Sequence, residues 1–355
     1  MDFAYKFSAV KGIQAERPYY IAMVPLRMLT KLFPPEKEYI QPEYRAQRRL
    51  NEQRIPEICS YILNNRDSYV FSALAASIDG EMRFEEVGVG QLGHLEVAMD
   101  AIFLINDGQH RLAAIFEALR EDEALGRETI SIVFYEDQGL ARSQQMFTDL
   151  NKHAVRTSNS LAELYDSRDE LAVATRAAIG AVSFIDKYTD KEKDNLGKLS
   201  AALFTLNMFY KANKRILGRD NVNELFKQFL IDYWGEVSRH MTPWVDLDAK
   251  CLSKQDLREK TIATQSVCIQ ALGKVGLYFR VEEQNLGVLA KLETIDWSRN
   301  AAIWKARAIN VRGRIITNEE AIALTANAIK TSMGLPLSEE EAKRENDFLS
   351  AQIEG

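Results

Sequence analysis

The sequence predicts a mixed α+β protein, with an N-terminal domain of strands and helices followed by a mainly α-helical C-terminal domain. Two observations lead to this prediction. Through the first 155 residues, short apolar runs typical of strands alternate with helical windows. From Ser160 onward, glycines become sparse and long windows of helical periodicity dominate. We therefore expect one domain at residues 1–158 and a second at 159–355.

Hydrophobic periodicity and turn residues define the expected elements. In the N-terminal half we expect strands at 4–9, 18–24, 69–76, 81–84, 96–105 and 130–135, and helices at 25–32, 43–64 and 139–152. In the C-terminal half we expect helices at 160–185, 199–217, 222–240, 254–280 and 316–333, followed by an exposed final helix from residue 338. The first half is thus expected to be compact α+β, and the second helical without an internal repeat.

Composition narrows the class of protein. With 46% hydrophobic and 27% charged residues, the chain has the composition of a soluble globular protein. The odd number of cysteines does not suggest a disulfide framework, and no Cys-x-x-Cys pair occurs. Because no signal sequence and no bilayer-spanning apolar run is apparent, we expect a cytoplasmic protein without membrane contact. The net charge of −6 means that any DNA binding must come from local basic faces.

One polar turn stands between a predicted strand and a predicted helix in the first domain. Asp107-Gly108-Gln109-His110-Arg111 follows an apolar run and precedes a helical stripe that begins at Leu112. Such a junction directs backbone N–H groups and the positive end of the helix dipole to one point, and Arg111 adds a full charge. The turn therefore suits a phosphate or a carboxylate. Gly108 would allow close approach of a ligand, and Asp107 could hold a metal ion or orient a water molecule.

The same turn has an ordinary structural interpretation. Asp-Gly pairs are common in turns, Asp is a common helix N-cap, and a basic residue in a first helical turn can simply be solvated. The residue-for-residue match to the DGQHR signature favours the functional interpretation. The chain resembles the DGQHR-domain family, which has a ParB/sulfiredoxin-like fold, and within it the DndB family of DNA phosphorothioation proteins. The similarity extends to residues 7–14, 147–152 and 160–166 and, more weakly, to 304–313.

This resemblance implies a nucleotide site at the turn and a role in DNA phosphorothioate (sulfur) modification. Gly108, Gln109 and Arg111 would hold the phosphates of ATP. Asp107 and His110 would be the catalytic candidates: Asp107 would coordinate Mg²⁺ or position water, and His110 would contact phosphate or sugar. The arrangement is compatible with slow, magnesium-dependent ATP hydrolysis. Because no Gly-x-x-x-x-Gly-Lys-Ser/Thr motif occurs, such an ATPase would not be of the P-loop kind.

Two further residues are candidates for the same pocket. Related folds bring a basic residue from a preceding helix toward the bound nucleotide, which points to Arg54. Asn151, at the end of the next predicted helix, is placed to complete the pocket. Sulfiredoxin-like relatives carry a nucleophilic cysteine in the turn where this chain has Gln109, so we do not expect sulfur transfer or reductase chemistry from this chain.

Two basic windows in the second half suggest contact with nucleic acid. Residues 198–219 and 298–314 each carry five Lys or Arg and no acid, and the second window contains Trp304. Basic residues with an aromatic among them suit a phosphate backbone. The alternative is that the basic residues of each window form ion pairs with acids elsewhere in the chain. In an acidic protein this alternative is about as reasonable as DNA binding. The presence of two windows favours DNA, with candidate contacts at Lys211, Lys214, Arg215, Arg307, Arg312 and Arg314.

The expected function is therefore an ATP-binding and double-stranded-DNA-binding accessory or regulatory protein of the modification system. It would act with other modification proteins of that system. Two alternatives remain open. One is a transcriptional repressor of the modification genes with a vestigial nucleotide pocket, although no helix-turn-helix signature is obvious. The other is a non-enzymatic scaffold for the modification complex. The sequence leaves the DNA sequence preference and the oligomeric state open.

Overall fold

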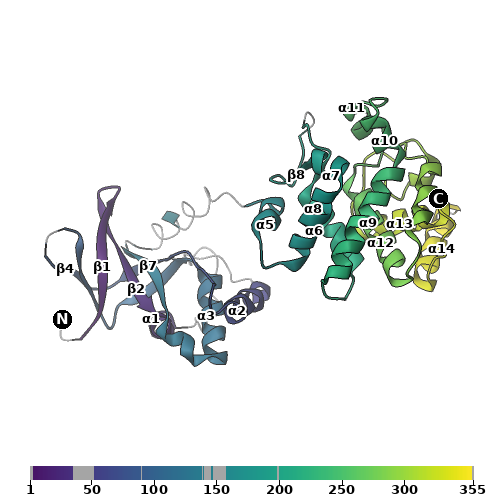
Figure 1. Cartoon of the computed structure of the whole chain (residues 1–355). Helices are drawn as coiled ribbons and strands as arrows, with labels where there is room; N and C mark the ends of the chain where they lie inside the picture. Colours follow the sequence, from purple (N-terminus) through teal and green to yellow (C-terminus); the bar gives the residue numbers. More distant parts are fainter. Residues whose placement is uncertain are drawn as a thin grey trace. The chain divides into compact units, whose positions relative to one another are not determined.

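The chain forms two compact units, which we describe separately. The structure is a computed structural model that describes residues 3–34, 52–88, 90–137, 139, 145–146, 157–197 and 200–353. Unit 1 is Met1–Val155 and unit 2 is Arg156–Gly355 (Figure 1). Unit 1 combines a large sheet with helices and unit 2 is mostly helical, which confirms the predicted mixed α+β class. No helix in the described ranges has the length and apolarity needed to cross a membrane.

A seven-stranded mixed sheet forms the centre of unit 1. Along the chain its strands are β1 (Ala4–Gln14), β2 (Arg17–Pro25), β3 (Leu74–Asp79), β4 (Met82–Glu86), β5 (Leu92–Ala98), β6 (Ile102–Asp107) and β7 (Thr129–Glu136). Their order in space is β4-β5-β1-β2-β7-β3-β6. All neighbours are antiparallel except β7 and β3, which run parallel. Strand β6 therefore lies at an edge of the sheet, paired only with β3.

The core of unit 1 lies between the sheet and three helices. These are α1 (Leu26–Leu32), α2 (Ile55–Asn64), which follows the short 3₁₀ helix η2 (Glu52–Arg54), and α3 (Gln109–Glu121), which precedes η3 (Glu123–Arg127). Leu29 of α1, Ile62 of α2 and Ile115 of α3 are buried in one cluster with Phe7 and Phe134 of the sheet. This packing holds α3 against the sheet and so fixes the direction in which its N-terminus points.

Three of the strand predictions in unit 1 are wrong in extent, and the first of these strands, predicted at 4–9, continues to Gln14 as β1. The single strand expected at 96–105 is two strands, because the chain turns after Ala98, where the Ala101 N–H donates to the Ala98 carbonyl at 3.1 Å. The strand expected at 69–76 begins only at Leu74, because the carbonyls of Ser72 and Ala73 accept hydrogen bonds from the Arg111 side chain and not from a neighbouring strand. The helix predicted at 139–152 lies almost wholly outside the described residues, as does the first part of 43–64.

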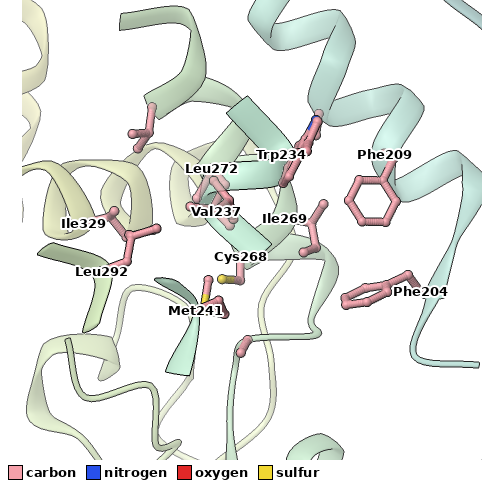
Figure 2. Packing of buried hydrophobic residues seen from close by; sticks show 14 of the residues in the cluster. Phe204, Phe209, Trp234, Val237, Met241, Cys268, Ile269, Leu272, Leu292 and Ile329 are labelled. Carbon is pink, nitrogen blue, oxygen red and sulfur yellow. The ribbon is translucent and has the colours of Figure 1, made fainter. Parts of the chain in front are cut away.

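Unit 2 is a helical bundle around an aromatic core. Its helices are α5 (Asn159–Tyr165), α6 (Glu170–Ala181), α7 (Ser183–Tyr188), α8 (Leu206–Leu217), α9 (Glu224–His240), α10 (Thr242–Asp248), α11 (Lys254–Lys260), α12 (Ser266–Val281), α13 (Glu319–Ser332) and α14 (Glu339–Ile353), with 3₁₀ helices η4 (Leu286–Thr294) and η5 (Ala302–Trp304). Figure 2 shows Phe204, Phe209, Trp234 and Cys268 packed in this core. The edge of the Phe209 ring meets Trp234 with centroids 5.0 Å apart.

The long helical windows predicted in unit 2 are broken into shorter helices. The window 160–185 contains α5, α6 and α7, because the Asp169 carboxylate accepts hydrogen bonds from the N–H groups of Leu171 and Ala172 and starts a new helix. The window 254–280 is divided into α11 and α12. Strand β9 (Phe204–Thr205), which pairs in parallel with β8 (Thr189–Asp190), precedes α8 inside the window 199–217. The side chains of Asp169 and Thr205 cap α6 and α8, so capping residues explain where these two helices begin.

Candidate functional site

The Asp-Gly-Gln-His-Arg turn is the junction between the edge strand β6 and helix α3. Strand β6 ends at Asp107, Gly108 is the N-cap, and α3 begins at Gln109. Gly108 has a left-handed backbone with φ of 99°. A Cβ placed there would lie 2.3 Å from Cδ2 of Leu74. Glycine is therefore required both by the backbone conformation and by the close approach of β3.

A β-bulge lies at the end of β6, directly before this glycine. Asp107 pairs with Ala75 and Ile105 pairs with Ala76, so Asn106 is an extra residue in the strand. Bulges redirect side chains and are frequent beside functional sites. Sequence reasoning did not single out Asn106, although an amide at the end of an apolar run is a signal that could have found it.

Asn106 is completely buried and only partly hydrogen-bonded. Its Nδ2 donates to Oγ of Ser77 at 2.6 Å and lies 3.0 Å from Sδ of Met146. Its Oδ1 has no hydrogen-bond partner among the described residues. A buried polar atom without a partner is uncommon in native proteins, because it loses its hydrogen bonds to water. Within the described structure, the junction thus contains one unsatisfied acceptor one residue before Asp107.

The Arg111 side chain donates hydrogen bonds both to the turn itself and to the segment that precedes β3. Its Nη2 donates to Oδ2 of Asp107 at 2.6 Å, and its Nη1 donates to the carbonyls of Ser72 at 2.7 Å and Ala73 at 3.0 Å. The Ser72 hydroxyl accepts a further bond. The Arg111 side chain is only 19% exposed, whereas Asp107 is 41% exposed. Arg111 therefore ties the segment before β3 to the turn after β6.

The electrostatics of the junction follow from these contacts. The Asp107 and Arg111 charges cancel at short range, so the remaining attraction for an anion comes from the N-terminus of α3. The first turn of α3 carries no acid, and Gly108 contributes no capping side chain. Gln109 and His110 occupy that first turn and are half-buried.

The two further candidates are not brought to the turn by described contacts. Asn151 lies outside the described residues. Arg54 ends η2 and is exposed at the start of α2. Helix α2 packs against α3 through the shared core, yet within the described part of unit 1 Arg54 makes no hydrogen bond or ion pair with the turn.

The first basic window in unit 2 separates into exposed and internally paired residues. Lys211 and Lys214 on α8 are exposed. Arg215 on the same helix donates to Glu319 at 2.6 Å and to Oε1 of Gln270 at 3.0 Å. Arg215 therefore joins α8 to α12 and to the start of α13, while the two lysines face solvent.

The second basic window separates in the same way. Arg307 donates to Glu345 of α14 at 2.5 Å, and its guanidinium lies 4.2 Å from the centre of the Phe348 ring. Arg312 and Arg314 are exposed, and no described acid forms an ion pair with either. Of the six predicted DNA contacts, four thus face solvent and two hold unit 2 together.

A buried carboxyl group beside Lys211 was missed by sequence reasoning. Oε1 of Glu163 accepts a hydrogen bond from Nδ2 of Asn207 at 2.5 Å, and its Oε2 is buried without a partner in the described structure. Burial raises the pKa of Glu163 to about 7, Asp194 adds to the rise, and the Asn207 bond and Lys211 oppose it. The partner Asn207 is distant in sequence, so no local pattern could have revealed this contact.

Comparison with known protein families identifies a match over most of the chain. Residues 7–336 match the family model DndB, which is described as DNA-sulfur modification-associated. No curated protein and no solved structure matches the chain. The match includes the β6–α3 junction and both basic windows, and it ends before α14.

Proposed function

The chain belongs to the DndB family of DNA-sulfur modification-associated proteins, and from this premise we propose that it is a nucleotide-dependent accessory factor of DNA sulfur modification. ATP would bind at the β6–α3 junction of unit 1, and double-stranded DNA would bind unit 2. The observation that supports the nucleotide site best is the junction itself. An acid-free helix N-terminus follows a bulged edge strand and a glycine that is required by its surroundings.

The phosphates would be held mainly by the backbone of the first turn of α3. N–H groups of a helix N-terminus and the helix dipole attract anions without a dedicated cation. Gly108 and Gln109 would provide these groups, and His110 lies within the same turn. The contacts of Arg111 support a different role from the one expected, because its donors already reach Asp107, Ser72 and Ala73. Arg111 would position the turn.

Asp107 supports a requirement for Mg²⁺. No group of three His, Cys, Asp or Glu residues in the described part of the chain is arranged to hold a metal by itself. Mg²⁺ is often bound by one or two carboxylates together with the phosphates of a nucleotide, and Asp107 suits that mode. Nucleotide binding should therefore depend on Mg²⁺, and slow hydrolysis would use water oriented by Asp107.

The DNA contacts would come from the four predicted contact residues of unit 2 that are exposed. Lys211 and Lys214 lie one turn apart on α8, and Arg312 and Arg314 lie on one loop. Exposed cations that are not paired with acids can neutralise phosphates at little internal cost. This local supply of charge is compatible with the net charge of −6.

A charge added at the first turn of α3 tests the nucleotide site. Gln109→Glu places an acid where helices tolerate acids well, so α3 should remain folded. The same acid should repel a bound phosphate, so we expect binding of ATP·Mg²⁺, measured by isothermal titration calorimetry, to fall at least tenfold. Gln255→Glu is the matched control, because it makes the same change in the first turn of α11 in unit 2.

The titration has two outcomes that contradict the nucleotide site. Unchanged affinity in folded Gln109→Glu would show that the phosphates lie elsewhere. Absence of binding to the wild-type chain would favour a second candidate, a DNA-binding regulator or scaffold whose turn is purely structural. The engagement of Arg111 with protein acceptors is the observation that favours this second candidate.

A further inference from the structure

The loop 310–314 of unit 2 is a small, exposed turn at the centre of an acid-free stretch. No acidic residue occurs between Asp296 and Glu319. Of the five cations in this stretch, Arg299 donates to the carbonyls of Arg258 and Thr261, and Arg307 pairs with Glu345. The other three, Lys305, Arg312 and Arg314, are exposed. The loop therefore presents positive charge that no neighbouring acid in the described structure neutralises.

Hydrogen bonds hold this loop in one conformation. Ile309 and Ile315 pair across its base as an antiparallel bridge. The Asn310 N–H donates to the Arg314 carbonyl at 2.9 Å. Oδ1 of Asn310 accepts from the N–H groups of Arg312 at 3.0 Å and Arg314 at 2.9 Å. Gly313 adopts a φ of 73°, which completes the turn. The two arginines are thus carried on a preorganised backbone.

The base of the loop is anchored in the core of unit 2. Trp304 is buried and stacks on Trp297 with centroids 5.5 Å apart. Ile309 is buried as well, and the Ile316 N–H donates to the Ala308 carbonyl at 2.8 Å. A loop with a buried base and an exposed tip can contact a binding partner without changing its own backbone conformation.

The composition of the tip indicates the kind of partner. Val311 is 100% exposed and stands directly before Arg312, Gly313 and Arg314. A single exposed valine needs no explanation by itself. Here it shares the tip with two unneutralised arginines and a glycine whose added Cβ would meet no atom within 4 Å. The only amide side chain of the tip, Asn310, already uses its oxygen internally.

We propose that this tip inserts into the minor groove of double-stranded DNA, which deepens the proposed DNA-binding function and rests on it. The minor groove is about 6 Å wide, and where A·T pairs narrow it further its negative potential attracts arginine. Minor-groove proteins also place small apolar side chains against base steps. Arg312 and Arg314 would lie in the groove, Val311 would contact its floor or walls, and Lys211 and Lys214 would contact phosphates. Arginine can also read guanine O6 and N7 in the major groove, but inosine keeps both atoms, so such readout would not distinguish an inosine duplex from a guanine duplex.

Three duplexes that differ in one groove at a time test this proposal. We would measure binding of the full chain by fluorescence anisotropy to an A·T-rich duplex, a G·C duplex and the same G·C duplex with inosine in place of guanine. Inosine lacks the guanine amino group, so the inosine duplex resembles A·T in the minor groove and G·C in the major groove. The proposal predicts that the A·T and inosine duplexes bind alike and about tenfold more tightly than G·C, for one discriminating contact of about 1.4 kcal/mol.

Two double variants separate groove contacts from phosphate contacts. Arg312→Gln with Arg314→Gln should remove the preference and bring all three duplexes to similar affinity. Lys211→Gln with Lys214→Gln is the matched control, and it should weaken all three equally while the preference remains. Both pairs are solvent-exposed, so both variants should fold, which circular dichroism would confirm.

The results also distinguish failure of this proposal from failure of DNA binding itself. If the wild-type chain binds the inosine and G·C duplexes alike, or if the arginine variant weakens all three duplexes equally, DNA binding stands and insertion into the minor groove is wrong. If the wild-type chain binds none of the duplexes, both proposals fail. The exposed tip would then be assigned to a protein partner.

Discussion

Two arginine-bearing turns of this protein use the same residue types for opposite purposes. In the turn 107–111, the guanidinium of Arg111 is surrounded by a carboxylate and two backbone carbonyls. In the loop 310–314, the backbone is hydrogen-bonded and the guanidinium groups of Arg312 and Arg314 face solvent. The comparison shows that an arginine beside a glycine does not by itself define an anion site. Whether such an arginine can bind an anion depends on whether its guanidinium donors face solvent or are already bonded to protein acceptors.

The glycines of the two turns differ in a parallel way. Gly108 and Gly313 both have positive φ, yet only Gly108 is crowded, by Cδ2 of Leu74 at 2.3 Å. The turn 107–111 is therefore packed into unit 1. The loop 310–314 extends from unit 2 into solvent. Replacing the glycine or the arginine should consequently lower stability in the turn 107–111 and DNA binding in the loop 310–314.

The largest effect on stability is expected for Arg111→Ala. The substitution removes a charge-assisted bond to Asp107 and three further bonds to Ser72 and Ala73, so it should lower the free energy of unfolding of unit 1 by about 3 kcal/mol. All four tryptophans, Trp234, Trp244, Trp297 and Trp304, lie in unit 2. The thermal transition followed by far-ultraviolet circular dichroism should therefore move, while the tryptophan fluorescence transition should not.

Arg312→Ala is the matched control for this prediction, because an exposed, unpaired arginine should change stability by less than about 0.5 kcal/mol. Equal effects of the two substitutions would contradict the distinction between the turns.

The next largest effect is expected when alanine replaces each glycine. At both positions the left-handed backbone costs about 1–2 kcal/mol for a residue with a Cβ. Gly108→Ala must also displace the flexible end of the Leu74 side chain, which adds about 1 kcal/mol, whereas Gly313→Ala meets no neighbour. Thermal unfolding of the two variants checks this order. A Gly313→Ala protein as unstable as Gly108→Ala would mean that crowding at Gly108 is unimportant.

A smaller effect, on binding alone, should separate exposed from paired cations of unit 2. Neutralising Lys211 and Lys214 should reduce the slope of log affinity for DNA against log salt by about 1.8, at about 0.9 for each phosphate contact. Replacing Arg215 and Arg307 by glutamine should leave the slope unchanged and lower the melting temperature, because each breaks an internal ion pair. The reverse pattern would assign the DNA contacts to the paired arginines.

The smallest effect concerns the pH dependence of unit 2. The pKa of Glu163 is about 7 in the folded protein against 4.5 for the free side chain, so unit 2 loses stability as pH rises from about 4.5 to 7. Glu163→Gln stays neutral and should remove this loss. At pH 8 the variant should be more stable by about 1 kcal/mol after allowance for solvent screening, or about 2–4 °C by tryptophan fluorescence, with little difference at pH 5. A wild-type-like pH profile in the variant would show that another group titrates.

The mixed α+β class could be predicted from the sequence because it depends on local patterns. Alternating apolar residues identify β1, β2 and β7, and the long amphipathic repeats identify α8, α9 and α13. The boundaries were less predictable. The turn after Ala98 is made of residues that are also common in strands, and Asp169 looks from sequence like any polar residue on a helix until its capping bonds are seen.

The position of the candidate site was predictable and its internal contacts were not. The Asp-Gly pair between an apolar run and a helical stripe marks the junction correctly. The partners of Arg111 lie 38 and 39 residues earlier in the chain, and the bulge at Asn106 depends on the register with β3. The same holds for Arg215 and Arg307, whose acids lie 104 and 38 residues away. Contacts over such separations leave no local pattern.

If the turn 107–111 binds nucleotide and the loop 310–314 binds DNA, the backbone amides of their glycines should respond to these ligands. NMR signals of glycine amides test both assignments most directly. The chain contains 18 glycines, so ¹⁵N-glycine labelling of the full protein gives a small set of amide signals that includes Gly108 and Gly313. Titration with ATP·Mg²⁺ should shift the Gly108 signal and leave Gly313 in place. Titration with an A·T-rich duplex should shift Gly313. A Gly108 signal that stays fixed at saturating ATP·Mg²⁺, or a Gly313 signal that stays fixed with DNA bound, would contradict the account.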